Sequence, residues 1–127
     1  MIVVVTGSRQ LAKSDDRFTI KARFLEVIHE LSPVTVHHGG AAGPDMWAAM
    51  EFWPNLKQHS PKNTEGRTHA QRLYDRNITM IVAALQEGET TMVSCWDGES
   101  HGTKHAIDYA VELGIPILHA HKNPEGT

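Results

Sequence analysis

The sequence predicts an α/β protein with a doubly wound, mainly parallel sheet of about five strands and helices on both faces. Strand-like and helix-like segments alternate along the chain, which is typical of parallel sheets connected by helices. The runs Ile2–Thr6 and Thr91–Trp96 are largely apolar and do not alternate with charged residues, as expected for strands covered on both faces. The length of 127 residues predicts a single domain, residues 1–127.

The first part of the chain is predicted to form two strands separated by a helix. After the strand Ile2–Thr6 and a polar loop, residues Arg17–Leu31 carry apolar side chains near helical spacing, and Pro33 ends this helix. The apolar side chains of the helix are Phe18, Leu25, Ile28 and Leu31. The β-branched Val34 and Val36 favour a second buried strand.

The middle of the chain is less regular until a long helix begins. Within residues 55–66, Leu56–His59 is predicted to form a short strand. A helix is predicted from Arg67 to about Gln86, and Gly88 closes it. Its apolar side is formed by Leu73, Ile78, Ile81, Val82 and Leu85.

The last part of the chain predicts a further strand, helix and strand. The strand Thr91–Trp96 is followed by a loop and by a helix over Lys104–Leu113. The packed face of this helix is formed by Ala106, Ile107, Ala110, Val111 and Leu113. Pro116 indicates that the strand Ile115–His119 lies at a sheet edge or begins there. The polar tail from Ala120 to Thr127 is predicted to fray.

Three loops follow strands and are therefore predicted to lie together at the carboxyl edge of the sheet. They comprise residues 7–9, 38–45 and 97–103. In open parallel sheets, ligands bind at this edge, near the point where the strand order reverses. The topology alone therefore predicts one shared site.

The middle loop is rich in glycine and leads into a short helix from Asp45 to about Trp53. Its glycines, which permit positive φ and the close approach of a ligand, are Gly39, Gly40 and Gly43. Pro44 suits the first helical position, and Pro54 ends the helix. The partial positive charge and unpaired N–H groups of a helix N-terminus suit a phosphate. The alternative is a tight turn whose glycines serve geometry alone.

Basic and amide side chains outside the glycine loop are further candidates for ligand binding. Gly7, Ser8 and Arg9 offer backbone N–H groups, a hydroxyl and a guanidinium that suit a phosphate. Arg76 and Asn77 lie near the apolar side of the long helix, and we expect them to point into the site. The alternative for Arg76 is a surface salt bridge with Asp75 or Glu51. Neither the dinucleotide-binding glycine pattern nor a P-loop occurs.

The last loop resembles the glycine loop because it also precedes a helix. Ser100, Gly102 and Thr103 could donate to a phosphate, or Thr103 could cap the helix. Asp97 and Glu99 could accept ribose hydroxyl groups or activate a water molecule, and the alternative is that they serve only loop solubility.

Composition and charge exclude several classes of protein. The net charge of −3 argues against a general nucleic-acid or membrane surface. No signal pattern precedes the first strand, no apolar run reaches membrane-spanning length, and the single cysteine fits a reducing compartment, so we expect a cytoplasmic protein. A homo-oligomer is compatible with these data.

The nine histidines do not predict a metal site. The adjacent pair His37 and His38 points to opposite faces of a strand, and no H-E-x-x-H motif or carboxylate cluster accompanies His101 and His105. Cys95 lies within a strand and is expected in the core rather than as a nucleophile. We expect no metal and no cofactor other than a nucleotide-type ligand.

Four motifs in the observed order resemble the SLOG superfamily, most closely its small single-domain YspA-like branch. They are Thr6–Arg9, His38–Asp45, Arg76–Met80 and Trp96–Thr103, and the resemblance covers Ile2 to about Leu118. The resemblance implies a Rossmann-like fold that binds nucleotides or nucleotide-derived ligands. Relatives within the superfamily include LOG-type phosphoribohydrolases, the DNA-processing protein DprA and sensor domains that bind NAD-derived signals.

The resemblance to the LOG-type enzymes covers phosphate binding better than catalysis. Their pattern Gly-Gly-x-Gly-Thr-x-x-Glu matches Gly102-Thr103, but the position of the catalytic glutamate is Ala106, which has no acid or base. Arg76 matches their arginine. Glu99 and Asp45 are the remaining candidates for a catalytic group.

Three functions are therefore open at this point. The first is the binding of a nucleotide-derived ligand, either ADP-ribose-like or a nucleoside phosphate, in sensing or sequestration. The second is hydrolysis of an N-glycosidic or phosphate bond of such a ligand, which needs a carboxylate to stabilise an oxocarbenium-like sugar. The third is a protein-interaction or single-strand nucleic-acid module, and the net charge disfavours nucleic acid.

Overall fold

Helices and strands alternate along the chain as its apolar pattern predicts. The computed structural model describes residues 1–124. In chain order the elements are β1 (Ile2–Gly7), the short 3-10 helix η1 (Arg9–Lys13), α1 (Arg17–Glu30), β2 (Thr35–His38), α2 (Pro44–Phe52), β3 (Leu56–Gln58), α3 (His69–Glu87), β4 (Thr90–Cys95), α4 (His101–Glu112) and β5 (Ile117–His119). Among the described residues, no helix is both long and apolar enough to cross a membrane.

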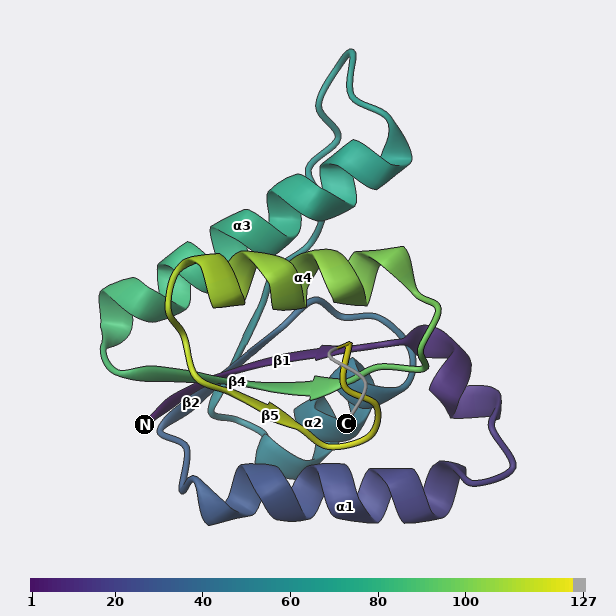
Figure 1. The fold of residues 1–127 in the computed structure, drawn as a ribbon. Coiled ribbons are helices and arrows are strands. Elements are labelled where there is room, and N and C mark those ends of the chain that lie inside the picture. Colours follow the sequence, from purple (N-terminus) through teal and green to yellow (C-terminus); the bar gives the residue numbers. More distant parts are fainter. Residues whose placement is uncertain (125–127) are drawn as a thin grey trace.

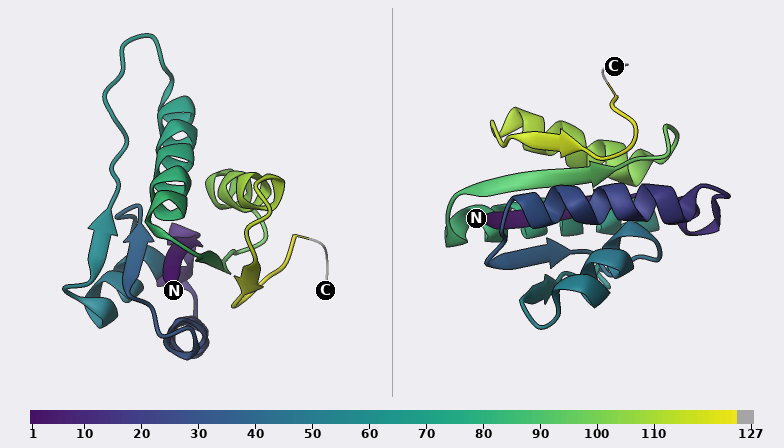
Figure 2. Two further views of the ribbon diagram at one scale, coloured as in Figure 1. Left: turned by 90° about the vertical axis from the view of Figure 1, so that its left-hand side faces the viewer. Right: turned by 90° about the horizontal axis from the view of Figure 1, so that it is seen from below.

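The strands form one five-stranded parallel sheet in the order β3-β2-β1-β4-β5. Helices α1 and α2 cover one face, and α3 and α4 cover the other (Figure 1, Figure 2). This is a Rossmann-like doubly wound fold, and it confirms the predicted fold class. β5 lies at one edge, as Pro116 indicated, and the short β3 lies at the other.

The central strand explains why both faces are covered. Side chains along a strand alternate between faces, and every side chain of β1 from Ile2 to Val5 is buried. Val3 and Val5 belong to the core beneath α1 and α2, whereas Ile2 and Val4 belong to the core beneath α3 and α4. A strand without a polar face therefore lies between two layers of helices.

Three predicted packing faces are wrong in part. Phe18 is 71% exposed at the start of α1, where the Arg17 guanidinium lies 4.6 Å from its ring centroid. On α3, Asn77 takes a buried position in the stripe that faces the sheet, so the apolar stripe is rotated. Three side chains expected on that stripe are therefore among the exposed hydrophobic residues: Ile78, Val82 and Leu85. Val111 of α4 and the C-cap residue Leu113 are likewise exposed, whereas Ala106, Ile107 and Ala110 form the buried face of the helix.

The ends of two segments also differ from the expectation. Val34 is 65% exposed and precedes β2, so it is not part of a buried strand. In the predicted tail, Ala120 is buried and its N–H donates to the Ser94 carbonyl at 2.8 Å, and Lys122 forms a bridge with Trp96. The chain therefore stays attached to the sheet as far as Lys122, so the predicted fraying does not begin at Ala120. Residues 125–127 lie outside the described part of the chain.

The strand order places the predicted loops at one edge. After β1 the chain builds the sheet outward through β2 and β3, then crosses back to place β4 on the other side of β1. The order therefore reverses between β1 and β4, and the loops that follow these strands and β2 lie at their carboxyl ends (Figure 1).

Candidate functional site

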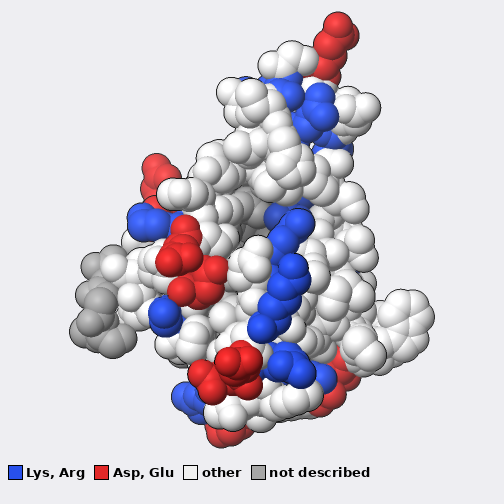
Figure 3. Space-filling view, turned by 90° about the vertical axis from the view of Figure 1, so that its right-hand side faces the viewer, with Lys and Arg blue, Asp and Glu red and all other residues white. Residues whose placement is uncertain are grey.

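A cavity of about 180 Å³ opens at the carboxyl edge of the sheet, between β1, α3 and the N-terminal ends of α2 and α4. Figure 3 views this edge, where a column of basic side chains runs beside a hollow. The predicted site residues that line the cavity are Gly7, Arg9, Asp45, Arg76, Asn77, Ser100, Gly102 and Thr103. All three predicted loops therefore contribute to one space, and so does α3.

Other predicted residues lie behind the cavity wall, where they connect the loops. The Ser8 side chain is fully buried, accepts a hydrogen bond from the Asp97 N–H at 3.0 Å and donates one to Thr103 Oγ1 at 3.4 Å. Although burial alone raises the pKa of Asp97, the N–H groups of Ser100 and Glu99 bond to its Oδ1 and lower the pKa below its ordinary value. Glu99 is exposed and does not line the cavity.

The three glycines of the middle loop have different roles, and none of them lines the cavity. Gly40 and Gly43 have positive φ, +77° and +82°, as the turn requires. Gly39 does not have a positive φ, so the expectation that this glycine is needed for its φ is wrong. A Cβ at Gly39 would instead collide with the Arg76 guanidinium. Gly39 is thus required for the close approach of a side chain.

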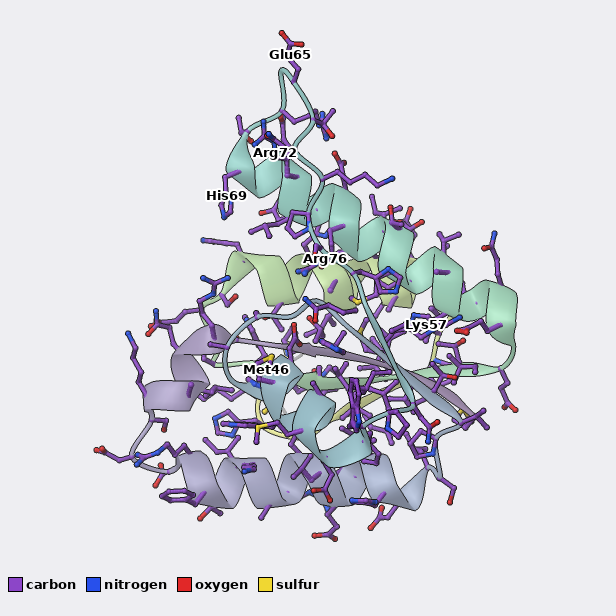
Figure 4. All side chains as sticks on the ribbon, turned by 180° about the vertical axis from the view of Figure 1, so that it is seen from behind. Met46, Lys57, Glu65, His69, Arg72 and Arg76 are labelled. Atoms are coloured by element: carbon purple, nitrogen blue, oxygen red, sulfur yellow. The ribbon has the colours of Figure 1, made fainter. Side chains whose placement is uncertain are left out.

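Arg76 is held at the centre of the site by the glycine loop. Its Nη1 donates to the Gly39 carbonyl at 2.9 Å and to the His59 carbonyl at 3.4 Å. The two carboxylates considered as surface partners are engaged elsewhere, since Asp75 binds Arg67 and Glu51 binds His29. Arg76 therefore points into the site rather than forming a surface salt bridge, and Figure 4 shows it between α3 and the loops.

Asn77 joins the two helices that border the cavity. Its Oδ1 accepts a hydrogen bond from Arg76 Nε at 3.1 Å, and its Nδ2 donates to the Gly102 carbonyl at 3.1 Å. The Asn77 amide thus sets the orientation of the guanidinium and fixes the first turn of α4. This polar role explains why an amide occupies a buried position on α3.

Asp45 is the buried carboxylate of the site. Its Oδ2 accepts hydrogen bonds from the N–H groups of Gly39 and Ala41 at 3.1 and 3.2 Å. Its Oδ1 is buried and has no hydrogen-bond partner within residues 1–124. Burial raises the pKa of Asp45 from its ordinary 3.8 to about 6, and the hydrogen bonds together with Arg76 and Arg9 act in the opposite direction. A ligand hydroxyl is one group that would satisfy the unpaired oxygen.

Two helix N-termini contribute to the cavity. α2 begins with Gly43 as its N-cap and Pro44 at its first position, as predicted. α4 begins at His101, earlier than the predicted Lys104, because Ser100 rather than Thr103 is the N-cap. Gly102 therefore lies in the first helical turn, where backbone N–H groups have no partner within the helix. Both helix ends are suited to an anion.

Two of the nine histidines, His37 and His59, form a hydrogen-bonded chain with Glu87 and Lys57. The buried His37 contacts the Glu87 carboxylate through Nε2, and its Nδ1 lies 2.9 Å from His59 Nε2. Lys57 Nζ donates to the same carboxylate at 2.6 Å. Burial, followed by the nearby His37 and Arg76, lowers the pKa of His59 and favours its neutral form. Within the described residues, no group of three histidine, cysteine or acidic side chains is arranged to hold a metal ion.

Two further positions matter for chemistry. Ala106, the position that the resemblance assigns to the LOG-type catalytic glutamate, is fully buried in the core and does not line the cavity. Cys95 is buried in the other core, as expected, and burial raises the pKa of its thiol to about 12. Neither residue offers an acid, a base or a nucleophile to the cavity.

The sequence interpretation missed the face of α3 that borders the cavity. His69 and Leu73 line the cavity together with Arg76. Their spacing of four and seven residues places all three on one side of a helix, so the pattern was present in the sequence. The pattern is hard to recognise because Leu73 also fits the apolar side of the predicted helix.

Replacing Gly39 by alanine is expected to displace the Arg76 guanidinium without unfolding the protein. The new Cβ would meet only the flexible end of Arg76, so the guanidinium must move while the backbone keeps an ordinary φ. For a phosphate bound in this cavity, we expect the affinity to fall roughly tenfold or more, since a displaced charge-assisted hydrogen bond contributes about 1.5–3 kcal/mol. Calorimetric titration with AMP measures the loss. An unchanged affinity would show that the position of the Arg76 guanidinium is unimportant.

The comparisons with known proteins identify no relative: no protein-family model, no curated protein and no solved structure matches the chain. The site is therefore interpreted from its own geometry. The features that carry this interpretation are two guanidinium groups, two helix N-termini and one buried carboxylate around a single cavity.

Proposed function

We propose that this protein binds a nucleotide-derived ligand, either a nucleoside phosphate or an ADP-ribose-like molecule, in the cavity at the carboxyl edge of the sheet. The observation that carries the proposal is the convergence of Arg9, Arg76 and the N-termini of α2 and α4 on this cavity. Guanidinium groups and helix N-termini are the main protein partners of phosphate. The whole protein carries a net charge of −3, so this local concentration of positive groups does not reflect a generally basic protein.

The other lining residues support a sugar next to the phosphate. The buried Asp45 Oδ1 is an unused acceptor, and a ribose hydroxyl is a donor of suitable size. Leu73 and Met80 supply apolar surface against which a sugar or base can pack. The resemblance to the SLOG superfamily supports the same ligand class, and it favours a role in sensing or sequestration.

A ligand of this class is expected to stabilise the fold. At a concentration 100-fold above Kd, binding adds roughly 2.7 kcal/mol, which raises the melting temperature of a domain of this size by about 10 °C. A thermal-shift screen with mono- and dinucleotides, ADP-ribose and cyclic nucleotides measures this rise. A panel in which no compound raises the melting temperature would exclude the proposal.

Hydrolysis of the ligand is a second candidate because of Asp45. A carboxyl group with a pKa of about 6 in a cavity is suited to general acid or base catalysis near neutral pH. Asp45 is favoured over Glu99, which is exposed and outside the cavity. Chromatography of stabilising nucleotides after incubation with the protein distinguishes the two functions, since a binding protein returns the nucleotide intact.

A further inference from the structure

A second cavity of about 250 Å³ lies on the opposite side of Arg76, between β3, α3 and the arm formed by residues 59–68. Arg76 lines both cavities and is therefore the partition between them. In Figure 4, Arg72 lies one turn along α3 from Arg76, toward the tip of the arm at Glu65. None of the candidate residues of the first cavity other than Arg76 takes part in this second space.

The second cavity is lined by cations that no carboxylate neutralises. Lys62 is exposed and has no ion-pair partner within the described residues. Arg72 donates through Nε and Nη2 to the Thr64 carbonyl at 3.2 and 2.9 Å, which leaves Nη1 without a partner there. The one acidic lining residue, Asp75, is bound by Arg67 through two hydrogen bonds at 2.9 and 3.1 Å. The wall therefore carries a positive charge in an acidic protein.

The neutral lining residues suit an oxyanion as well. Ser60 and Thr79 present hydroxyl groups, and His59 is held mainly neutral with its Nε2 bonded to His37. These groups can donate to phosphate oxygens beside the cations. Each cavity is smaller than the roughly 300–1,000 Å³ typical of small-molecule sites, whereas the two together reach that range.

We propose that this second cavity is a subsite for a second phosphate, so that the ligand is a nucleotide with phosphate groups at two separate positions. One phosphate lies in the first cavity with Arg9, the other lies with Lys62 and Arg72, and Arg76 contacts both. The inference rests on the proposed function, because it assigns the first phosphate to the first cavity. The second subsite implies that a nucleotide monophosphate occupies only one of the two cavities.

The test compares AMP with adenosine 3′,5′-bisphosphate by calorimetric titration. The wild-type protein is expected to bind the bisphosphate at least tenfold more tightly, because each new charge-assisted contact strengthens binding. In the double variant Lys62→Ala/Arg72→Ala, this advantage is expected to disappear while the affinity for AMP changes by less than about twofold, since neither side chain lines the first cavity.

The matched control is Lys21→Ala/Arg23→Ala on α1, across the sheet. It removes the same two residue types and the same charge, so it reports any general electrostatic effect. The control is expected to keep the bisphosphate advantage. Because Arg72 also anchors the arm, Lys62→Ala alone is measured as well, and it is expected to lose at least threefold in bisphosphate affinity without a change in melting temperature.

The outcomes separate the two proposals. If AMP binds but the bisphosphate has no advantage, or if the double variant keeps that advantage, the subsite is refuted while the first site stands. If the control loses the advantage equally, the effect is general attraction and the subsite is again refuted. If no nucleotide binds the wild-type protein, both proposals fail.

Discussion

Replacing Arg76 by alanine is expected to reduce phosphate affinity at least tenfold. The guanidinium is half-buried, held by the Gly39 carbonyl and directed into the cavity, so it is positioned before the ligand arrives. Truncating one partner of such a charge pair costs roughly 2–5 kcal/mol, largely because the other charge is left unpaired. Calorimetric titration with AMP measures the loss, and an unchanged affinity would remove Arg76 from the site.

The matched control for this variant is Arg67→Ala, which removes the same side chain from the segment that precedes α3. Arg67 is bound to Asp75 and lies outside the cavity, so AMP affinity is expected to change little. From the sequence alone, the stability of the Arg76 variant would be expected to stay the same. The structure instead predicts a modest loss, on the order of 1 kcal/mol, because the hydrogen bonds to the Gly39 and His59 carbonyls disappear.

Between pH 4 and pH 8, Asp45→Asn is expected to gain roughly 2–3 kcal/mol of stability relative to the ligand-free wild-type protein. The pKa of Asp45 is raised in the folded state, from 3.8 to about 6, so the folded protein holds this proton more tightly than the unfolded chain does. The stabilisation from the protonated form is complete below pH 4 and is lost as the pH rises through 6. Asparagine has no proton to lose and avoids this loss.

Denaturant unfolding between pH 4 and 8 measures the effect. The stability of the variant relative to the wild type should increase as the pH rises from 4 to 8, because folded Asp45 is protonated at pH 4 and ionised at pH 8. Asp75→Asn, which changes an exposed carboxylate, is the control and is expected to show no such gain. A stability difference between the wild type and Asp45→Asn that stays constant from pH 4 to pH 8 would contradict the raised pKa. The same variant also tests hydrolysis, because it should bind a nucleotide but leave it intact.

The arrangement of strands and helices could be predicted from the sequence more completely than the way in which the helices pack. Continuous apolar strands such as β1 require cover on both faces, and this requirement determines the layers without knowledge of any contact. The apolar face of α3 could not be predicted in the same way. Helical spacing there places Ile78 and Val82 in the core. The structure shows instead that Asn77 points inward, where it orients Arg76 and fixes the first turn of α4.

The location of the site could also be predicted, whereas the division of roles within it could not. Topology places the loops after β1, β2 and β4 together, as expected. Sequence does not distinguish Ser8, which connects two loops behind the wall, from Arg9, which lines the cavity. It also does not reveal that Asp45 keeps an unpaired oxygen, because this depends on burial produced by distant segments.

The central position of β1 has a consequence for folding kinetics. β1 precedes the other four strands of the sheet along the chain, yet Ile2 pairs with Thr90 and Gly7 with Cys95, so one of its two edges stays open until β4 has been synthesised. Such a high contact order slows folding, since the entropy of closing a long loop is lost before the contact forms. During synthesis, the apolar edge of β1 is therefore exposed to other nascent chains, and the ligand cavity forms only when β4 docks.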